Sequence, residues 1–166
     1  SLVGSEMCIR DREKSDIASH AKKNWEAIKH EEKKRESRLD GVPLALPALT
    51  RAQRLQEKAS YAGFDWDNID SVWEKLHEEI DELKEAYKSK DISGLEEEIG
   101  DVLFSVVNLA RYLKLDSEDL LRKANSKFIN RFKAIEKELV KRGKTIDEAN
   151  LDEMDEIWDQ IKSQVK

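Results

Sequence analysis

Apolar side chains recur every three or four residues along five stretches of this chain, and that spacing restricts the folds it can adopt. The stretches cover approximately residues 51–62, 69–88, 93–113, 117–143 and 151–163. An α-helix turns by about 100° per residue, so such residues form a stripe along one face that must be buried. No stretch alternates apolar and polar residues as a half-buried strand would. We therefore predict an all-α fold, a helical bundle of about four core helices plus a short C-terminal helix.

Three of these stretches carry long apolar stripes. The stripes consist of Ile69, Val72, Leu76, Ile80, Leu83 and Tyr87, then of Leu95, Ile99, Val102, Val106, Leu109 and Leu113, and then of Leu121, Ala124, Phe128, Phe132, Ile135 and Leu139. Ser93 and Glu96 have the spacing of a capping box, which predicts that the third helix begins near Ser93. Asp116 or Ser117 is expected to cap the fourth helix. We expect the stripes to pack together as the core.

Composition divides the chain into three regions. Residues 1–12 lack periodicity, a basic start and an apolar segment, so we interpret them as a leader that is not native rather than a signal peptide. Residues 13–49 are highly charged and end in a segment with two prolines, which predicts a charged helical arm and a linker. Residues 50–166 are expected to form the functional domain.

Length and charge exclude several classes of protein. A chain of 166 residues has room for one domain and an appendage. The mean hydropathy of −0.76 argues against a membrane span, and the pI of about 5.3 argues against a general nucleic-acid binder. The single cysteine, Cys8, excludes an internal disulfide and fits a reducing cytoplasm, where we expect the protein to act.

Two acidic pairs occupy matching positions on the second and third helical stretches. Glu79 and Glu82 follow a leucine of one stripe by three and six residues, and Glu98 and Asp101 follow a leucine of the other stripe by the same intervals. If the stripes face each other, the four carboxylates emerge at one edge of the helix pair and can converge. Residues 74–101 hold eleven acidic residues and four lysines, a net charge of −7, so the carboxylates repel one another unless they bind protons or a cation.

Carboxylate oxygens in this arrangement predict a site for a hard cation. Oxygen ligands favour magnesium, manganese or calcium over zinc or copper. The alternative is that each acidic cluster is a solvated helix face, which is common in a chain with 40% charged residues. The repeated spacing beside two apolar stripes favours the metal site.

The third helical stretch is apolar on nearly every side over residues 102–110. One neighbouring helix cannot cover such a surface, so we expect a second copy of the chain to cover the rest in a homodimer. The alternative is that the first and last helices cover it within one chain.

Two cations on the fourth stretch complement the acidic pairs. Lys127 and Arg131 lie four residues apart and project from the same helix face. A compact ammonium and a planar guanidinium both suit phosphate oxygens. By itself such a pair is usually surface charge, but together with a metal site it indicates a polyanionic substrate.

Five motifs give residues 50–162 a specific resemblance. They are Gly63-Phe64-Asp65-Trp66, Glu78-Glu79-x-x-Glu82, Glu97-Glu98-x-x-Asp101, Asn108-Leu109-Ala110-Arg111 and Lys123-Ala124-Asn125-x-Lys127-Phe128-x-x-Arg131-Phe132. As a set they resemble the C-terminal catalytic domain of the MazG family of nucleoside triphosphate pyrophosphohydrolases. The acidic motifs alone are shared by a wider all-α superfamily that includes dimeric dUTPases. Full MazG proteins carry a preceding copy of the domain, and residues 13–39 resemble the tail of that copy and the connector that follows it.

The resemblance implies an activity and a set of roles. The activity is magnesium-dependent hydrolysis of NTPs and dNTPs to the nucleoside monophosphate and pyrophosphate, with manganese as an alternative cofactor. The implied metal ligands are Glu79, Glu82, Glu98 and Asp101, and the implied substrate-binding residues are Lys127, Arg131 and Trp158. Two alternatives stay open, namely a pyrophosphatase restricted to one nucleotide such as dUTP or dCTP, and a non-catalytic helical dimerisation module.

Four residues have a structural role as an alternative to a functional one. Glu78 and Glu97 adjoin implied ligands and are candidates for the group that accepts a proton from water, but outward-facing helix charge is the favoured interpretation of each residue taken alone. Phe104 could stack on a base, but packing in the core or in a dimer seam is the expected role. For Trp158, a place in the core of the last helix is the alternative to nucleotide contact.

Overall fold

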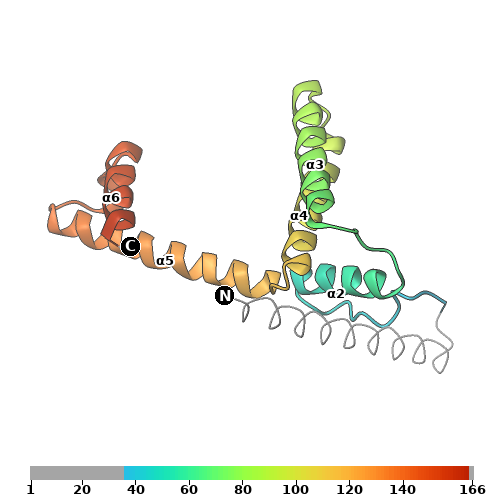
Figure 1. The fold of residues 1–166 in the computed structure, drawn as a ribbon. Helices are drawn as coiled ribbons and strands as arrows, with labels where there is room; N and C mark the ends of the chain where they lie inside the picture. Colours follow the sequence, from blue (N-terminus) through green and yellow to red (C-terminus); the bar gives the residue numbers. More distant parts are fainter. Residues whose placement is uncertain (1–35, 165–166) are drawn as a thin grey trace, which may run out of the picture. The chain divides into compact units, whose positions relative to one another are not determined.

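The computed structural model describes residues 36–164, which fold into helices separated by turns (Figure 1). The elements are α2 (Ala48–Tyr61), α3 (Ile69–Ser89), α4 (Ile92–Tyr112), α5 (Ser117–Lys141), the 3₁₀-helix η1 (Ile146–Glu148) and α6 (Leu151–Gln164). No residue from 36 to 164 lies in a strand, which confirms the predicted all-α fold. Within the same range, no helix is both long and apolar enough to cross a bilayer.

The chain forms two compact units that divide after Ser117. The first unit contains α2, α3 and α4, and the second contains nearly all of α5 together with η1 and α6. Residues 36–47 form turns and bends, and α2 begins directly after Pro47, a few residues earlier than predicted. The interpretations of residues 1–12 and of the arm before residue 36 lie outside the described part of the chain.

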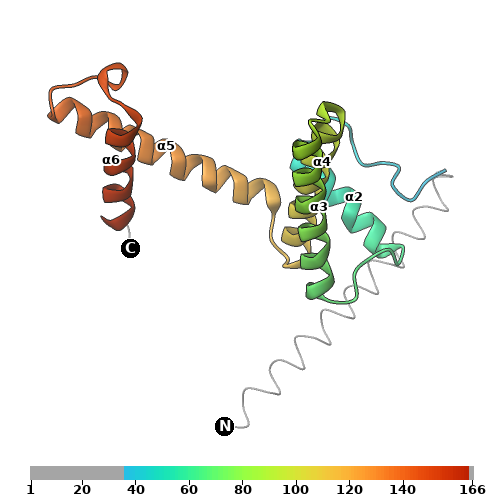
Figure 2. The same ribbon diagram turned by 90° about the horizontal axis from the view of Figure 1, so that it is seen from above.

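Packing of α3 against α4 dominates the first unit, and α2 lies against α4 (Figure 2). Val72 and Leu76 of α3 and Val107 and Ala110 of α4 are buried. Fully burying a valine or leucine side chain typically contributes about 1.5–3 kcal/mol, and an alanine contributes less. This contact holds the acidic segments of α3 and α4 beside each other.

The buried face of α4 differs from the prediction. Ile99, Val106 and Leu113 were expected in the core, but they are 49%, 47% and 49% exposed, whereas Val107 and Ala110 are buried. Because α4 is apolar on nearly every side over residues 102–110, its periodicity does not identify the face that meets α3. The rotation of α4 is determined by its contacts with α3 and α2.

The start of α4 also differs from the prediction. The carboxylate of Asp91 accepts a hydrogen bond of 3.1 Å from the backbone N–H of Gly94, so the helix begins at Ile92. The predicted capping box of Ser93 and Glu96 is therefore wrong. A Cβ atom on Gly94 would lie 2.6 Å from Asp91 Oδ2, so glycine permits the close approach of this cap.

The second unit packs the C-terminal half of α5 against α6. Its core consists of Ile135, Leu139 and Ile157. In the first half of α5, Leu121 and Phe128 of the predicted stripe are 49% and 57% exposed. The apolar stripe of α5 is thus buried only towards its C-terminal end within this unit.

Candidate functional site

Three carboxylates from two helices converge at one edge of the α3–α4 pair. Glu79 of α3 and Glu98 and Asp101 of α4 each place one oxygen within 4.8 Å of the others. The two helices pack side by side, so residues at equivalent positions along their acidic edges become neighbours. The structure therefore brings together three of the four residues predicted as metal ligands.

Glu79 is the most buried member of this cluster, at 5% exposure. Lys75, one helical turn earlier, places its ammonium 2.7 Å from Glu79 and 3.1 Å from Glu78. These contacts, first of all the hydrogen bond to Glu79, raise the pKa of Lys75 above its ordinary value. Sequence reasoning missed Lys75, although its i,i+4 spacing from Glu79 was a usable signal.

Glu98 has one carboxylate oxygen, Oε2, that is buried and has no hydrogen-bond partner. Its pKa is raised above the ordinary value of 4.5, first by partial burial and then by the charges of nearby carboxylates, chiefly Glu82 and Asp101. Both effects disfavour a negative charge at this position in the metal-free protein. A cation between the carboxylates would offset the repulsion and provide a partner for Oε2.

The other predicted acidic residues lie at the margin of the cluster. Glu82 is exposed and lies outside the group of three, although its charge contributes to the raised pKa of Glu98. Glu97 is exposed and also contributes to that shift. Glu78 is exposed and forms an ion pair with Lys75. A role for Glu78 or Glu97 in accepting a proton stays a prediction.

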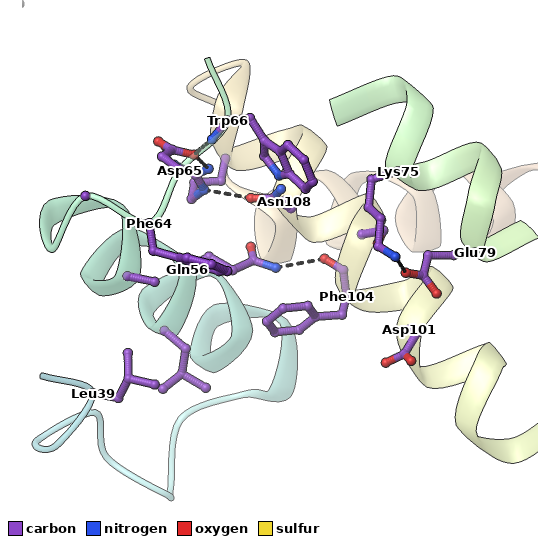
Figure 3. A pocket seen from close by; sticks show the side chains of 15 residues that line it. Leu39, Gln56, Phe64, Asp65, Trp66, Lys75, Glu79, Asp101, Phe104 and Asn108 are labelled. Atoms are coloured by element: carbon purple, nitrogen blue, oxygen red, sulfur yellow. Dashed lines mark hydrogen bonds and ion pairs between the residues drawn. The ribbon is translucent and has the colours of Figure 1, made fainter. Parts of the chain in front are cut away.

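A cavity of about 710 Å³ adjoins the carboxylate cluster within the first unit (Figure 3). Glu79 and Asp101 belong both to the cluster and to the cavity wall, which also includes the aromatic residues Phe64, Trp66 and Phe104. Phe104, for which packing in a core or a dimer seam was expected, is 46% exposed and faces this space. The volume falls in the range typical of small-molecule sites.

A buried arginine ties the turn before α3 to α4 at the cavity wall. Arg111 is 8% exposed, and its two terminal nitrogens donate to the two carboxylate oxygens of Asp65 at 3.1 and 2.5 Å. Its Nε donates to Oδ1 of Asn108 at 2.9 Å. Bidentate contacts of this kind are directional as well as strong. This network holds Asp65, and with it the adjacent Trp66, against α4.

A second polar contact joins α2 to α4 across the same cavity. Nε2 of Gln56 donates to the backbone carbonyl of Phe104 at 2.8 Å, and Gln56 is only 7% exposed. Its Oε1 is buried and has no hydrogen-bond partner. Sequence reasoning did not identify Gln56, because one glutamine on an amphipathic helix has no distinctive local pattern.

The predicted substrate-binding residues lie in the second unit. The guanidinium of Arg131 is 5.4 Å from the ring centroid of Trp158, and the ring of Phe128 is 5.6 Å from that of Trp158. Trp158 also packs against the core of this unit. Lys127 is exposed on α5. The joint action of these residues with the carboxylates of the first unit stays a prediction.

A family model and the similar proteins of known name indicate the same family. Residues 68–135 match the MazG nucleotide pyrophosphohydrolase domain, a range that begins at the residue before α3 and ends within α5. The chain is 46% identical over 149 residues to the nucleoside triphosphate pyrophosphohydrolase/pyrophosphatase MazG of Thermotoga maritima, covering 89% of this chain and 57% of that protein. It is 44% identical over 157 residues to the nucleoside triphosphate pyrophosphohydrolase of Escherichia coli K12, covering 90% and 59%.

A protein of Bacillus subtilis, YabN, is 38% identical over 157 residues, which represent 93% of this chain and 31% of YabN. The chain thus spans less than two thirds of the length of each of these relatives. The matched range includes the three converging carboxylates, Asn108 and Arg111. The chain therefore carries a nucleotide pyrophosphohydrolase domain of the MazG family.

Proposed function

We propose that the protein hydrolyses nucleoside triphosphates, both NTPs and dNTPs, to the nucleoside monophosphate and pyrophosphate with Mg²⁺ as cofactor. The observation that carries this proposal is the convergence of Glu79, Glu98 and Asp101 beside a cavity large enough for a nucleoside. The names of the relatives from T. maritima and E. coli describe this class of reaction. Manganese is an alternative cofactor because it accepts the same oxygen ligands.

The carboxylates fit a magnesium ion by their chemistry. The donor set contains only carboxylate oxygens, and the buried Oε2 of Glu98 lacks a partner. Glu79, Glu98 and Asp101 would hold the ion, and Glu82 would supply a further oxygen. A bound ion would neutralise charge on the triphosphate and lower the pKa of coordinated water.

Lys75 would change partners when the site fills. Its raised pKa keeps the ammonium charged at neutral pH, and its present partner is the predicted ligand Glu79. With Glu79 holding a cation, Lys75 would be available for a phosphate oxygen of the substrate. Lys75 would then stabilise negative charge on the phosphates during bond cleavage.

Hydrolysis also needs a group that accepts a proton from the attacking water. The water oxygen forms a bond to phosphorus while the α–β phosphoanhydride bond breaks and pyrophosphate departs, so one proton must move to a base. Glu78 and Glu97 are our candidates because each adjoins a proposed ligand. Lys127 and Arg131 would bind the phosphates, and Trp158, whose ring lies against the Arg131 guanidinium, would lie beside the nucleotide.

We further propose that the protein acts as a homodimer. Ile99, Leu103 and Val106 are 49%, 56% and 47% exposed and follow one another along one side of α4. A second copy of the chain that covered this stripe would remove it from water. Nucleic acid and membranes are not among the proposed partners, in keeping with the acidic pI of about 5.3. The single cysteine agrees with a place in the cytoplasm.

Product analysis tests the function directly. The purified chain is incubated with each common NTP and dNTP plus Mg²⁺, and monophosphate and pyrophosphate are separated by chromatography. We expect both products from many nucleotides. Products from a single nucleotide would indicate the restricted pyrophosphatase, and the absence of products from all of them would favour the non-catalytic dimerisation module.

A variant of the cluster tests the assignment of its ligands. Glu98→Ala should abolish turnover while helicity by circular dichroism stays nearly unchanged. Glu96→Ala is the matched control, because Glu96 is an exposed glutamate on the same helix outside the cluster. Retained turnover in Glu98→Ala would refute the assignment of Glu98 as a metal ligand.

A further inference from the structure

The cavity beside the carboxylates contains a hydrogen-bond donor whose direction is determined by its neighbour. Nε of Arg111 donates to Oδ1 of Asn108 at 2.9 Å. A guanidinium has donors only, so the carboxamide of Asn108 must present its oxygen to Arg111. The amide N–H₂ of Asn108 is therefore the group that remains for a ligand in the cavity, whose wall includes Asn108.

The same cavity contains an acceptor whose direction is determined in the same way. Nε2 of Gln56 donates to the backbone carbonyl of Phe104, and a carbonyl can only accept. The oxygen of Gln56 consequently cannot exchange places with the nitrogen. This oxygen is buried without a partner in a side chain that is 93% buried, and such a group is costly unless a ligand or water satisfies it.

Aromatic walls surround this donor and acceptor. In the view of Figure 3, Gln56 reaches from α2 towards α4, and Trp66, Asn108 and Phe104 lie around the space that it enters. The wall continues to Glu79 and Asp101 of the carboxylate cluster. A molecule with a flat ring, a hydrogen-bonding edge and a polyphosphate tail would match these three regions together.

We propose that this cavity binds the nucleobase, with Asn108 as donor and Gln56 as acceptor to the edge of the base and with Phe104 and Trp66 against its faces. The proposal rests on the function proposed above, since the phosphates would lie at the carboxylates. Every common base presents a donor next to an acceptor on one edge, as in the N1–H and O6 of guanine or the N3–H and O4 of uracil. One donor and one acceptor therefore recognise a base without selecting a single one. Asp65 and Arg111 act as positioning residues, because they orient Asn108.

Binding of ATP and of ribose 5-triphosphate, which lacks the base, tests the proposal. The dissociation constants are measured by equilibrium dialysis with Mg²⁺ on the wild-type chain and on Asn108→Asp and Gln56→Met. Each ligand is supplied as its α,β-methylene analogue, in which a CH₂ group replaces the bridging oxygen so that the α–β bond is not hydrolysed during dialysis. Asn108→Asp keeps an oxygen for Arg111 and loses the donor, and Gln56→Met keeps the length of the side chain and loses the acceptor. Asn150→Asp is the control for the added charge, because Asn150 accepts a backbone hydrogen bond from Glu153 that aspartate can also accept.

The decisive quantity is the ratio of the two affinities. Each variant should weaken the binding of ATP about tenfold relative to that of ribose 5-triphosphate, which is the typical effect of one lost hydrogen bond. The control should leave the ratio of the two affinities unchanged. An added negative charge or a loosened fold would weaken both ligands alike. An equal loss for both ligands, or no loss for either, would overturn the proposal.

The outcome also separates this proposal from the proposed function. If the wild-type chain prefers ATP through Asn108 and Gln56 but does not hydrolyse it, the base pocket is supported and the proposed pyrophosphohydrolase activity is refuted. If the wild-type chain hydrolyses ATP and both variants leave the ratio of the two affinities unchanged, only the proposed base pocket is refuted. Binding of neither ligand by the wild-type chain would refute both.

Discussion

The contact between Arg111 and the turn before α3 provides a prediction with a definite magnitude. Arg111→Met keeps an apolar stem in the space but removes two hydrogen bonds to Asp65 and one to Asn108. Breaking a fully buried ion pair typically costs 3–5 kcal/mol. The side chain of Asp65 is 32% exposed and can regain water, so we expect a smaller loss of about 2 kcal/mol in the free energy of unfolding. For a chain of this size, this loss corresponds to a melting temperature lower by about 4–8 °C.

Thermal unfolding followed by far-UV circular dichroism measures this effect. Arg54→Met is the matched control, because Arg54 is exposed on α2 and, among the residues from 36 to 164, forms an ion pair with Glu57 one helical turn away; such surface pairs contribute about 0.5 kcal/mol or less. Asp65→Asn keeps a polar partner for Arg111 and should fall between the control and Arg111→Met. A melting temperature of Arg111→Met equal to that of Arg54→Met would refute the reasoning that this contact joins the turn to α4.

Three further predictions address charge and assembly. Burial and neighbouring carboxylates raise the pKa of Glu98 above 4.5, so ionisation of Glu98 destabilises the metal-free protein as the pH rises. In EDTA, the melting temperature of Glu98→Gln should therefore exceed that of the wild type by a margin that grows from about pH 4 to about pH 8. A margin that does not change with pH would count against this cause. Lys127→Ala should raise KM for ATP about tenfold with little change in kcat, whereas unchanged kinetics would reduce Lys127 to surface charge. Leu103→Lys should shift the chain towards monomer in sedimentation velocity, and a shift equal to that of Leu44→Lys, on the exposed linker, would argue against the α4 interface.

Much of the fold was readable from local patterns. Apolar residues at intervals of three and four predicted helices close to their observed bounds, because each helix satisfies its own backbone hydrogen bonds and needs a partner for only one face. Helix ends were less predictable. Asp91 rather than Ser93 caps α4, since both residue types are good caps and only the backbone geometry decides between them. The short helix η1 was missed because three residues have no readable period.

The amino-acid sequence by itself determined the chemistry available to this protein and the elements that carry it. The spacing of Glu79, Glu98 and Asp101 relative to the apolar stripes was sufficient to predict that their carboxylates would meet, because helical geometry relates sequence interval to direction. This inference needed only the assumption that the two helices pack together.

Only the tertiary structure decided which face of α4 is buried and what the cavity presents to a ligand. Arg111 contacts Asp65, which lies 46 positions away in the sequence. The buried oxygen of Gln56 lacks a partner because of the groups that surround it where α2 packs against α4. A helix that is apolar on nearly every side has no preferred rotation of its own, so its orientation depends on the shapes of its neighbours. Contacts of this kind arise from packing between distant segments, and no local pattern encodes them.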